Sequence, residues 1–166
     1  MRCLRLAPDG GGHLYSRPVT METGILKVKR LRPGARLPER ATEGSSGFDL
    51  FACVEGQDSV VLGRRPLRVG TGIAIEFPRG FDVQVRPRSG LAAKGVGVTL
   101  GTIDSDYRGE VLVTMYLFGD LDEYRVANGD RIAQLVVTQL GDLGVVEADE
   151  LTRTARGIGG HGSTGQ

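Results

Sequence analysis

The chain has no long apolar run, few cysteines and almost no net charge, and each absence removes a class of protein. No stretch approaches the roughly 20 apolar residues that a transmembrane helix needs, and residues 1–12 lack the apolar core of a secretion signal. Cys3 and Cys53 are the only cysteines, and their separation gives neither a disulfide framework nor a zinc-binding spacing. We therefore expect a protein that stays in the reducing cytoplasm and has no membrane partner.

Positive and negative charges balance almost completely. The sequence has 21 Lys and Arg against 20 Asp and Glu, so no strong positive field favours nucleic acid as a partner.

The length and the glycine content describe a small domain with many turns. A chain of 166 residues fits one domain, and 40% hydrophobic with 25% charged residues is ordinary for a globular protein. Its 26 glycines are about twice the usual share, which indicates many tight turns or close backbone approaches.

Helical periodicity is scarce, whereas alternation with a period of two recurs. Residues 72–77 alternate in this way, and Val83 and Val85 alternate with polar neighbours before Pro87 ends the strand. Residues 111–118 and 132–140 are apolar on both faces, so we expect both faces to be covered, with another subunit as one candidate for the cover. Closely spaced strands separated by Gly, Pro and Asp turns predict an all-β sandwich or barrel.

One short helical turn and two terminal segments complete the organisation. Residues 89–94 are the expected helical turn, with Ser89 as its N-cap. Residues 1–23 show no alternation and are interpreted as a mobile extension, in which Met21 is an alternative start. Residues 24–152 are the expected barrel domain, and the glycine-rich residues 153–166 are expected to be a flexible arm.

The segment GTIDSDYRGE at residues 101–110 gathers five functional side chains in a glycine-bounded turn between strands. A solvated turn is the plain interpretation. A calcium loop is a second one, since Asp104 and Asp106 have D-x-D spacing, but Arg108 then occupies the third ligand position.

Four further segments could carry chemistry, although each has a structural explanation when taken alone. RPRSGLAAKG at residues 86–95 could hold a phosphate through exposed amides with Arg88 and Ser89. RGIGGHGSTG at residues 156–165 has free amides suited to an anion, but the strand and helix of a dinucleotide fingerprint are missing. GSSGFDLFAC at residues 44–53 places Asp49 in a strand, and GDRIAQLV at residues 129–136 places Gln134 in another.

In their order along the chain, the five segments resemble the five signature motifs of the dUTP pyrophosphatase family. The resemblance implies a jelly-roll-like β-barrel in a homotrimer whose active sites are built from more than one subunit. It also implies Mg²⁺-dependent hydrolysis of dUTP to dUMP and pyrophosphate, which limits uracil in DNA and supplies dUMP for thymidylate synthesis.

The same resemblance assigns roles to individual residues. Asp104 is the expected general base for the attacking water, and Tyr107 is expected to exclude a 2′-hydroxyl by packing on the deoxyribose. Asp49 is expected to reach Mg²⁺ through water, while the substrate phosphates hold most of the metal. The hairpin from Val98 to Ile103 is expected to form the uracil pocket, and the arm to close over the nucleotide. The expected substrate-binding residues are Arg88, Ser89, Gly90, Val98, Gly101, Thr102, Ile103, Tyr107, Leu112, Gln134, Arg156, His161, Gly162, Ser163 and Thr164.

Two positions depart from the family pattern. His161 stands where the family usually has the phenylalanine that stacks on uracil, so we expect weaker closure of the arm and a pH-dependent affinity. Val98 stands where many bacterial members have asparagine, which affects the details of the base pocket.

Two other functions are compatible with parts of this pattern. A dCTP deaminase-like protein shares the fold and the trimer, but that branch lacks the tail motif found at residues 156–165. A non-catalytic nucleotide-binding regulator is the second alternative, and the loss of Asp104 or Tyr107 would have indicated it; both residues are present.

Overall fold

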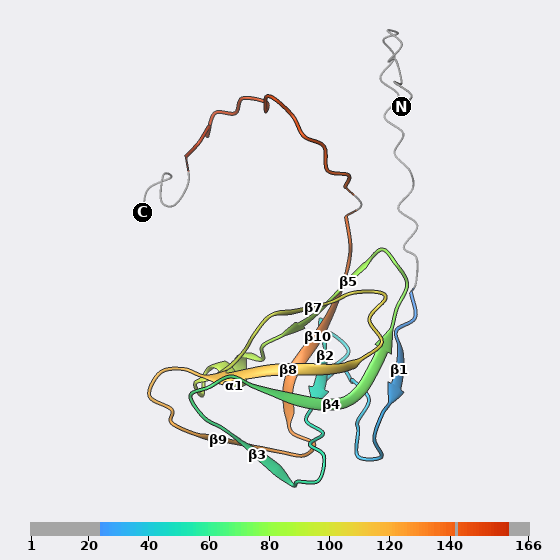
Figure 1. Cartoon of the computed structure of the whole chain (residues 1–166), viewed down its shortest axis with the longest axis vertical. Helices are drawn as coiled ribbons and strands as arrows, with labels where there is room; N and C mark the ends of the chain where they lie inside the picture. The colour runs from blue at the N-terminus through green and yellow to red at the C-terminus, as the bar shows by residue number, and fades with distance from the viewer. Residues whose placement is uncertain (1–23, 142, 160–166) are drawn as a thin grey trace.

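The computed structural model describes residues 24–141 and 143–159 (Figure 1). Within these ranges the chain forms ten strands and one short helix. The elements are β1 (Lys27–Arg30), β2 (Gly47–Phe51), β3 (Ser59–Leu62), β4 (Leu67–Glu76), β5 (Phe81–Arg86), α1 (Ser89–Ala92), β6 (Val96–Val98), β7 (Gly101–Ile103), β8 (Glu110–Leu117), β9 (Tyr124–Ala127) and β10 (Arg131–Gln139).

The strands form three antiparallel sheets. One has the order β1-β4-β8-β6, the second has the order β2-β10-β5-β7, and β3 pairs with β9. All pairings between named strands are antiparallel. The prediction of an all-β fold is therefore confirmed.

The hydrophobic core collects buried side chains from all three sheets. Strand β5 shows how the sequence produces this: Val83 and Val85 are buried, whereas the polar residues between and beside them are only half-buried. The strand ends at Arg86, directly before Pro87, because proline cannot donate to the ladder. The predicted one-sided strand is confirmed.

We expected residues 111–118 and 132–140 to be covered on both faces. Within the single chain this holds for β10 but not for β8. In β10 the neighbouring residues Leu135 and Val136 are both buried, as expected. In β8, Val111 and Val113 are buried, but Leu112 between them is 40% exposed. The single chain therefore leaves the outer face of β8 open, and its cover by another subunit remains a prediction.

Two local predictions were wrong. The helical turn is present, but its N-cap is Arg88 and not Ser89: Arg88 has extended backbone angles, and its carbonyl accepts hydrogen bonds from the amides of Leu91 and Ala92. The segment from Val98 to Ile103 is not a paired hairpin, because β6 pairs with β8 and β7 pairs with β5. The chain here crosses from one sheet to the other.

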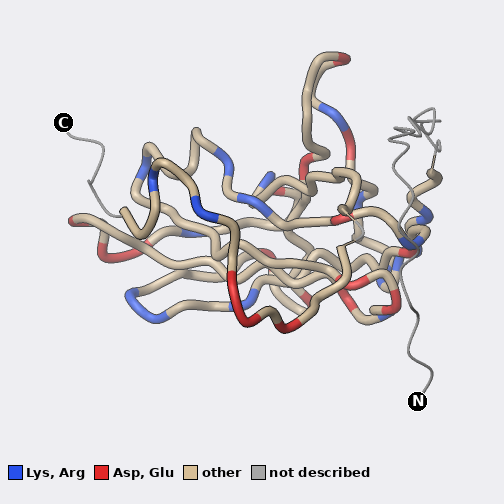
Figure 2. Tube along the Cα trace, turned by 90° about the horizontal axis from the view of Figure 1, so that it is seen from above, with Lys and Arg blue, Asp and Glu red and all other residues tan. Residues whose placement is uncertain are grey.

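Charges of both signs are interspersed over the surface (Figure 2), in keeping with the near-zero net charge. In the described part of the chain, no helix is long and apolar enough to cross a membrane.

After β10 the chain leaves the barrel, and residues 143–159 run away from it (Figure 1). This segment has no strand and exposes Leu143, Val145, Val146, Leu151 and Ile158. The predicted boundary at residue 152 remains a prediction, and the predicted extension at residues 1–23 lies outside the described residues.

Candidate active site

Two cavities bring the motif residues together. The first, here called the Asp104 cavity, has a volume of about 200 Å³ and is lined by Val85, Gly101, Thr102, Ile103, Asp104, Tyr107, Glu110, Val111 and Leu112. The second, here called the Arg88 cavity, has a volume of about 370 Å³ and is lined by Ala41, Ser45, Ser46, Gly47, Asp49, Arg88, Ser89, Gly90 and Gln134. Among the described residues the two cavities share no lining residue.

The wall of the Asp104 cavity is the turn between β7 and β8. The amide of Tyr107 donates to the carbonyl of Asp104 at 3.0 Å, which closes the turn. The Tyr107 hydroxyl donates to the carbonyl of Glu110, also at 3.0 Å. A Cβ atom on Gly109 would lie 2.3 Å from that hydroxyl oxygen, so only glycine lets the Tyr107 ring fold back in this way.

The Arg108 side chain contacts the backbone of the same turn and the Glu76 carboxylate of β4. Its Nη1 donates to the carbonyls of Ser105 at 2.8 Å and Tyr107 at 2.9 Å. Its Nε lies 3.6 Å from the Glu76 carboxylate at the end of β4.

Glu76 is half-buried, and the pKa of its carboxyl is lowered. The hydrogen bond from Lys27 Nζ, 2.6 Å long, is the largest cause that lowers the pKa of Glu76. The charge of Lys27 lowers this pKa further, partial burial opposes the shift, and the charge of Arg108 lowers the pKa by the smallest amount. Glu76 of β4 thus pairs with Lys27 of β1 and with Arg108 of the turn between β7 and β8.

The centre of the Arg88 cavity is an ion-pair cluster around Asp49. Asp49 is only 8% exposed in the middle of β2. Arg88 Nε donates to its Oδ1 at 3.0 Å and Arg131 Nη1 to its Oδ2 at 3.3 Å. Arg88 Nη1 also donates to the carbonyl of Arg131 at 3.0 Å. A buried carboxylate needs such compensation, and in return it fixes Arg88 at the cavity wall.

Gln134 is held in the same cavity by backbone contacts. Its Nε2 donates to the carbonyl of Pro87 at 2.9 Å. A Cβ atom on Gly47 would lie 2.6 Å from Gln134 Oε1, so glycine at position 47 provides the space for this side chain.

Helix α1 presents exposed backbone to the Arg88 cavity. Ser89 and Gly90 are exposed, whereas Leu91 is buried and anchors the turn in the core. The first amides of a helix have no partner within it, so they are available to an anion.

The donor set can be compared with the needs of Mg²⁺. Within the described ranges, no group of three or more His, Cys, Asp or Glu side chains lies close enough together to hold a metal ion. Asp49 has both carboxylate oxygens paired with arginine, but each oxygen has a second lone pair that can accept a water. This arrangement fits a hydrated ion carried by phosphates, which is how Mg²⁺ usually binds.

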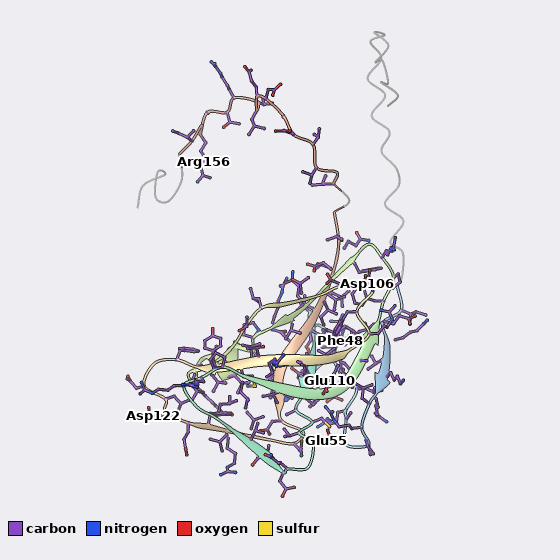
Figure 3. All side chains as sticks on the ribbon, in the orientation of Figure 1. Phe48, Glu55, Asp106, Glu110, Asp122 and Arg156 are labelled. Carbon is purple, nitrogen blue, oxygen red and sulfur yellow. The ribbon has the colours of Figure 1, made fainter. Side chains whose placement is uncertain are left out.

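The remaining predicted residues lie elsewhere. Val98 has its side chain in the core, 4% exposed, and lines neither cavity. Arg156 lies on the arm away from the barrel (Figure 3), where its Nε donates to the carbonyl of Gly159 at 2.9 Å. His161, Gly162, Ser163 and Thr164 lie outside the described residues.

The structure adds cavity residues to which the sequence assigned no role. Glu110 and Val85 line the Asp104 cavity, and Gly47 and Ser46 line the Arg88 cavity. All of these except Val85 stand inside the motif segments, but a local pattern does not indicate which side chains face a cavity.

The family model that matches the chain is dUTPase, over residues 34–165. A deoxyuridine 5'-triphosphate nucleotidohydrolase of Hydrogenobaculum sp. is 52% identical over 147 residues, covering 84% of this chain and 97% of the relative. One from Treponema denticola is 46% identical over 142 residues, covering 82% of this chain and 95% of the relative.

Solved structures agree with the sequence comparisons. The Staphylococcus bacteriophage 80alpha dUTPase with dUPNHPP is similar with a TM-score of 0.77 and 27% identity, covering 86% of this chain and 99% of that one. The chain belongs to the dUTPase family. The resemblance inferred from the five motifs is thereby confirmed, together with the jelly-roll-like all-β fold and an enzymatic activity as a dUTP diphosphatase.

Proposed function

We propose that the chain hydrolyses dUTP to dUMP and pyrophosphate with Mg²⁺, by attack of an Asp104-activated water on the α-phosphorus. Asp104 takes a proton from the water as its oxygen bonds to the α-phosphorus, and the bond to the bridging oxygen breaks so that pyrophosphate leaves. The product would supply thymidylate synthesis, and the reaction would keep uracil out of DNA. Cys53, buried and free, suits a reducing cytoplasm.

This proposal is supported mainly by the lining of the Asp104 cavity, which brings the candidate general base and the candidate nucleoside-binding residues together. Asp104, Tyr107 and the strand β7 line one small space. Asp104 itself is exposed, so it can meet a water that a bound nucleotide brings into line. A carboxylate beside a pocket of nucleoside size supports the role of general base.

The same cavity supports selection of a uracil deoxynucleotide. The Tyr107 ring, held by Gly109 and the Glu110 carbonyl, supplies a flat wall for the deoxyribose. Backbone groups of Gly101, Thr102 and Ile103 would read the base edge, with Leu112 beside them. A thymine methyl and a ribose 2′-hydroxyl would then both meet protein atoms.

The Arg88 cavity supports binding of the phosphate chain. Arg88 has a fixed position through Asp49, and arginine pairs well with phosphate oxygens. Ser89 and Gly90 would add exposed amides, and Gln134 would position phosphate or water.

A complete site is proposed to combine more than one copy of the chain, as in the homotrimer that the family resemblance implies. Asp104 and the phosphate-binding groups line two separate cavities of one chain, and the reaction needs both sets of groups at one nucleotide. A homotrimer in which one copy supplies the Asp104 cavity and another the Arg88 cavity meets this need. The exposed Leu112 face of β8 is compatible with burial between copies.

The arm is proposed to complete the site. Arg156, Ser163 and Thr164 would contact the terminal phosphates, with Gly162 allowing close approach and His161 stacking on uracil. The apolar residues exposed along residues 143–159 support docking of this segment on another copy. Closure would exclude water and strengthen the electrostatic interactions inside.

Mg²⁺ would be held mainly by the substrate phosphates and through water by Asp49. When bound, the ion neutralises phosphate charge and helps to orient the chain of phosphates.

Pyrophosphate release from dUTP, dTTP, dCTP and UTP with Mg²⁺ tests the proposal, for the native chain and Asp104→Asn. We expect release from dUTP alone, and its loss in the variant. Full activity of Asp104→Asn would remove the general-base role, and equal release from UTP would contradict the role of Tyr107.

A further inference from the structure

Strand β4 has an irregular segment opposite the start of β8. Its pairing with β8 steps from Gly70 opposite Leu112 to Ala74 opposite Glu110, so residues 71–73 face Val111 alone. Gly72 at the centre of this bulge has a φ of +68°, a conformation that favours glycine. Bulges of this kind leave backbone groups without ladder partners, and they are frequent beside active sites.

The side chain of Glu110 fills the gap that this bulge creates. Its Oε1 accepts a hydrogen bond of 2.7 Å from the amide of Gly72. The hydroxyl of Thr71 donates to the carbonyl of Val111 at 2.6 Å and satisfies the other side of the bulge. The bulge therefore depends on the position of the Glu110 carboxylate.

Arg32 compensates the charge of that carboxylate. Arg32 Nη2 donates to the same Oε1 of Glu110, and the two side chains are 24% and 20% exposed. Arg32 Nη1 also lies 3.7 Å from the carboxylate of Glu55. A Cβ atom on Gly70 would lie 2.7 Å from Glu110 Oε1 and 2.9 Å from Arg32 Nη2, so the backbone is shaped around this pair.

Glu110 is also the last anchor of the turn that carries Asp104. It is the first residue of β8, lines the Asp104 cavity, and its carbonyl accepts the Tyr107 hydroxyl. Figure 3 labels Glu110 at the start of β8 beside β4, and Asp106 in the turn above it. A shift of the Glu110 backbone would thus move the carbonyl that accepts the Tyr107 hydroxyl.

We propose that Arg32 is a positioning residue for dUTP hydrolysis, which acts through Glu110 to fix the turn bearing Asp104 and Tyr107. The inference rests on the proposed function, because the roles of Asp104 and Tyr107 are given there. Arg32 itself does not line the Asp104 cavity. Its loss would leave a mostly buried carboxylate without its cation, and the carboxylate would turn toward solvent and release Gly72 and the turn.

The test compares Arg32→Met with the native chain and with two reference variants. Arg32→Lys keeps the charge, and Arg64→Met removes an exposed ion pair, that of Arg64 with Asp122, whose atoms are 2.7 Å apart. For each protein, kcat and KM for dUTP are measured separately, together with the ratio of kcat/KM between dUTP and UTP and the Tm.

For Arg32→Met we expect kcat to fall by about tenfold or more, since small misplacements of reacting groups are costly. The preference for dUTP over UTP should fall by about fivefold, because Tyr107 is no longer held. Arg32→Lys should recover a large part of both losses, and Arg64→Met should stay within about twofold of the native chain.

An Arg32→Met protein with a lower Tm but native kcat and native dUTP preference would overturn the proposal, since Arg32 would then serve stability alone. If Arg32→Met does not fold, Glu110→Gln gives the same test, because its amide oxygen can still accept from Gly72 while the charge is lost. An active Asp104→Asn would instead overturn the proposed function, so the two failures are distinguishable.

Discussion

Arg88 and Asp49 are joined by a hydrogen bond of 3.0 Å between Nε and Oδ1, at the point where β2 meets the entrance to α1. The buried carboxylate aims the guanidinium at the Arg88 cavity, where the phosphates are proposed to bind. Asp49 thus has a structural role toward Arg88 in addition to its proposed contact with hydrated Mg²⁺.

Asp49→Asn should weaken substrate binding more than chemistry. The charge-assisted bonds to Arg88 and Arg131 become weaker, and Arg88 loses its fixed position. We expect KM for dUTP to rise about tenfold, with a smaller change in kcat. Asp122→Asn, which alters the exposed pair with Arg64, is the matched control. A native KM in Asp49→Asn would show that Arg88 does not depend on this carboxylate.

Gly47→Ala should disturb Gln134. The added methyl would lie 2.6 Å from Gln134 Oε1, so the side chain must move and lose its bond to Pro87. We expect a loss of about 1–3 kcal/mol in the free energy of unfolding and a higher KM. Gly44→Ala is the control, because a Cβ there meets nothing within 4 Å. Equal stability of the two variants, measured by urea denaturation, would contradict the contact.

Gly109→Ala should relax the discrimination between deoxyribose and ribose. A methyl at position 109 would lie 2.3 Å from the Tyr107 hydroxyl oxygen and push the ring away from the Glu110 carbonyl. The ratio of kcat/KM for dUTP to that for UTP is expected to fall by about tenfold. Gly63→Ala, in open space, should leave the ratio unchanged. An unaltered ratio in Gly109→Ala would mean that the ring position seen here is not the one that selects the sugar.

Lys27→Met should raise the pKa of Glu76, because the Lys27 hydrogen bond is the largest cause of its lowered value. A carboxyl whose pKa is lower in the folded state stabilises the fold above its ordinary pKa, about 4.3, and loses this effect as the pH falls through the folded-state pKa. The Tm of native protein should therefore exceed that of Lys27→Met near pH 7, and the difference should shrink as the pH falls below the ordinary pKa of a glutamate and through the lowered pKa of Glu76. Carbon-13 NMR titration of Glu76 measures the shift directly, with Lys29→Met as the control on the same strand. An identical titration in native and Lys27→Met protein would refute the assignment.

Local sequence patterns predicted the structural features that depend on neighbouring residues. The alternation around Val83 and Val85 and the stop at Pro87 predicted β5 correctly, because burial of one face and a missing amide act within a few residues. The five motifs predicted the family. The pairing of β6 and β7 with different sheets could not be read in this way, since strand partners are chosen by contacts far along the chain.

The Arg32–Glu110 pair shows the same limit in the site. The two residues are 78 positions apart, and no pattern near Arg32 indicates that it pairs with the motif that contains Asp104 and Glu110. The cap of α1 was predicted wrongly for a different reason. Ser89 is the preferred residue type at an N-cap, but the extended backbone that defines the cap lies at Arg88.

A crystal structure of the assembled protein with a non-hydrolysable dUTP analogue and Mg²⁺ tests the proposed role of Asp104 directly. We predict an Asp104 carboxylate of one copy within hydrogen-bonding reach of a water in line with the α-phosphorus, and Arg88 of another copy on the phosphates. An α-phosphorus remote from every copy of Asp104, in a site with ordered nucleotide, would contradict that role.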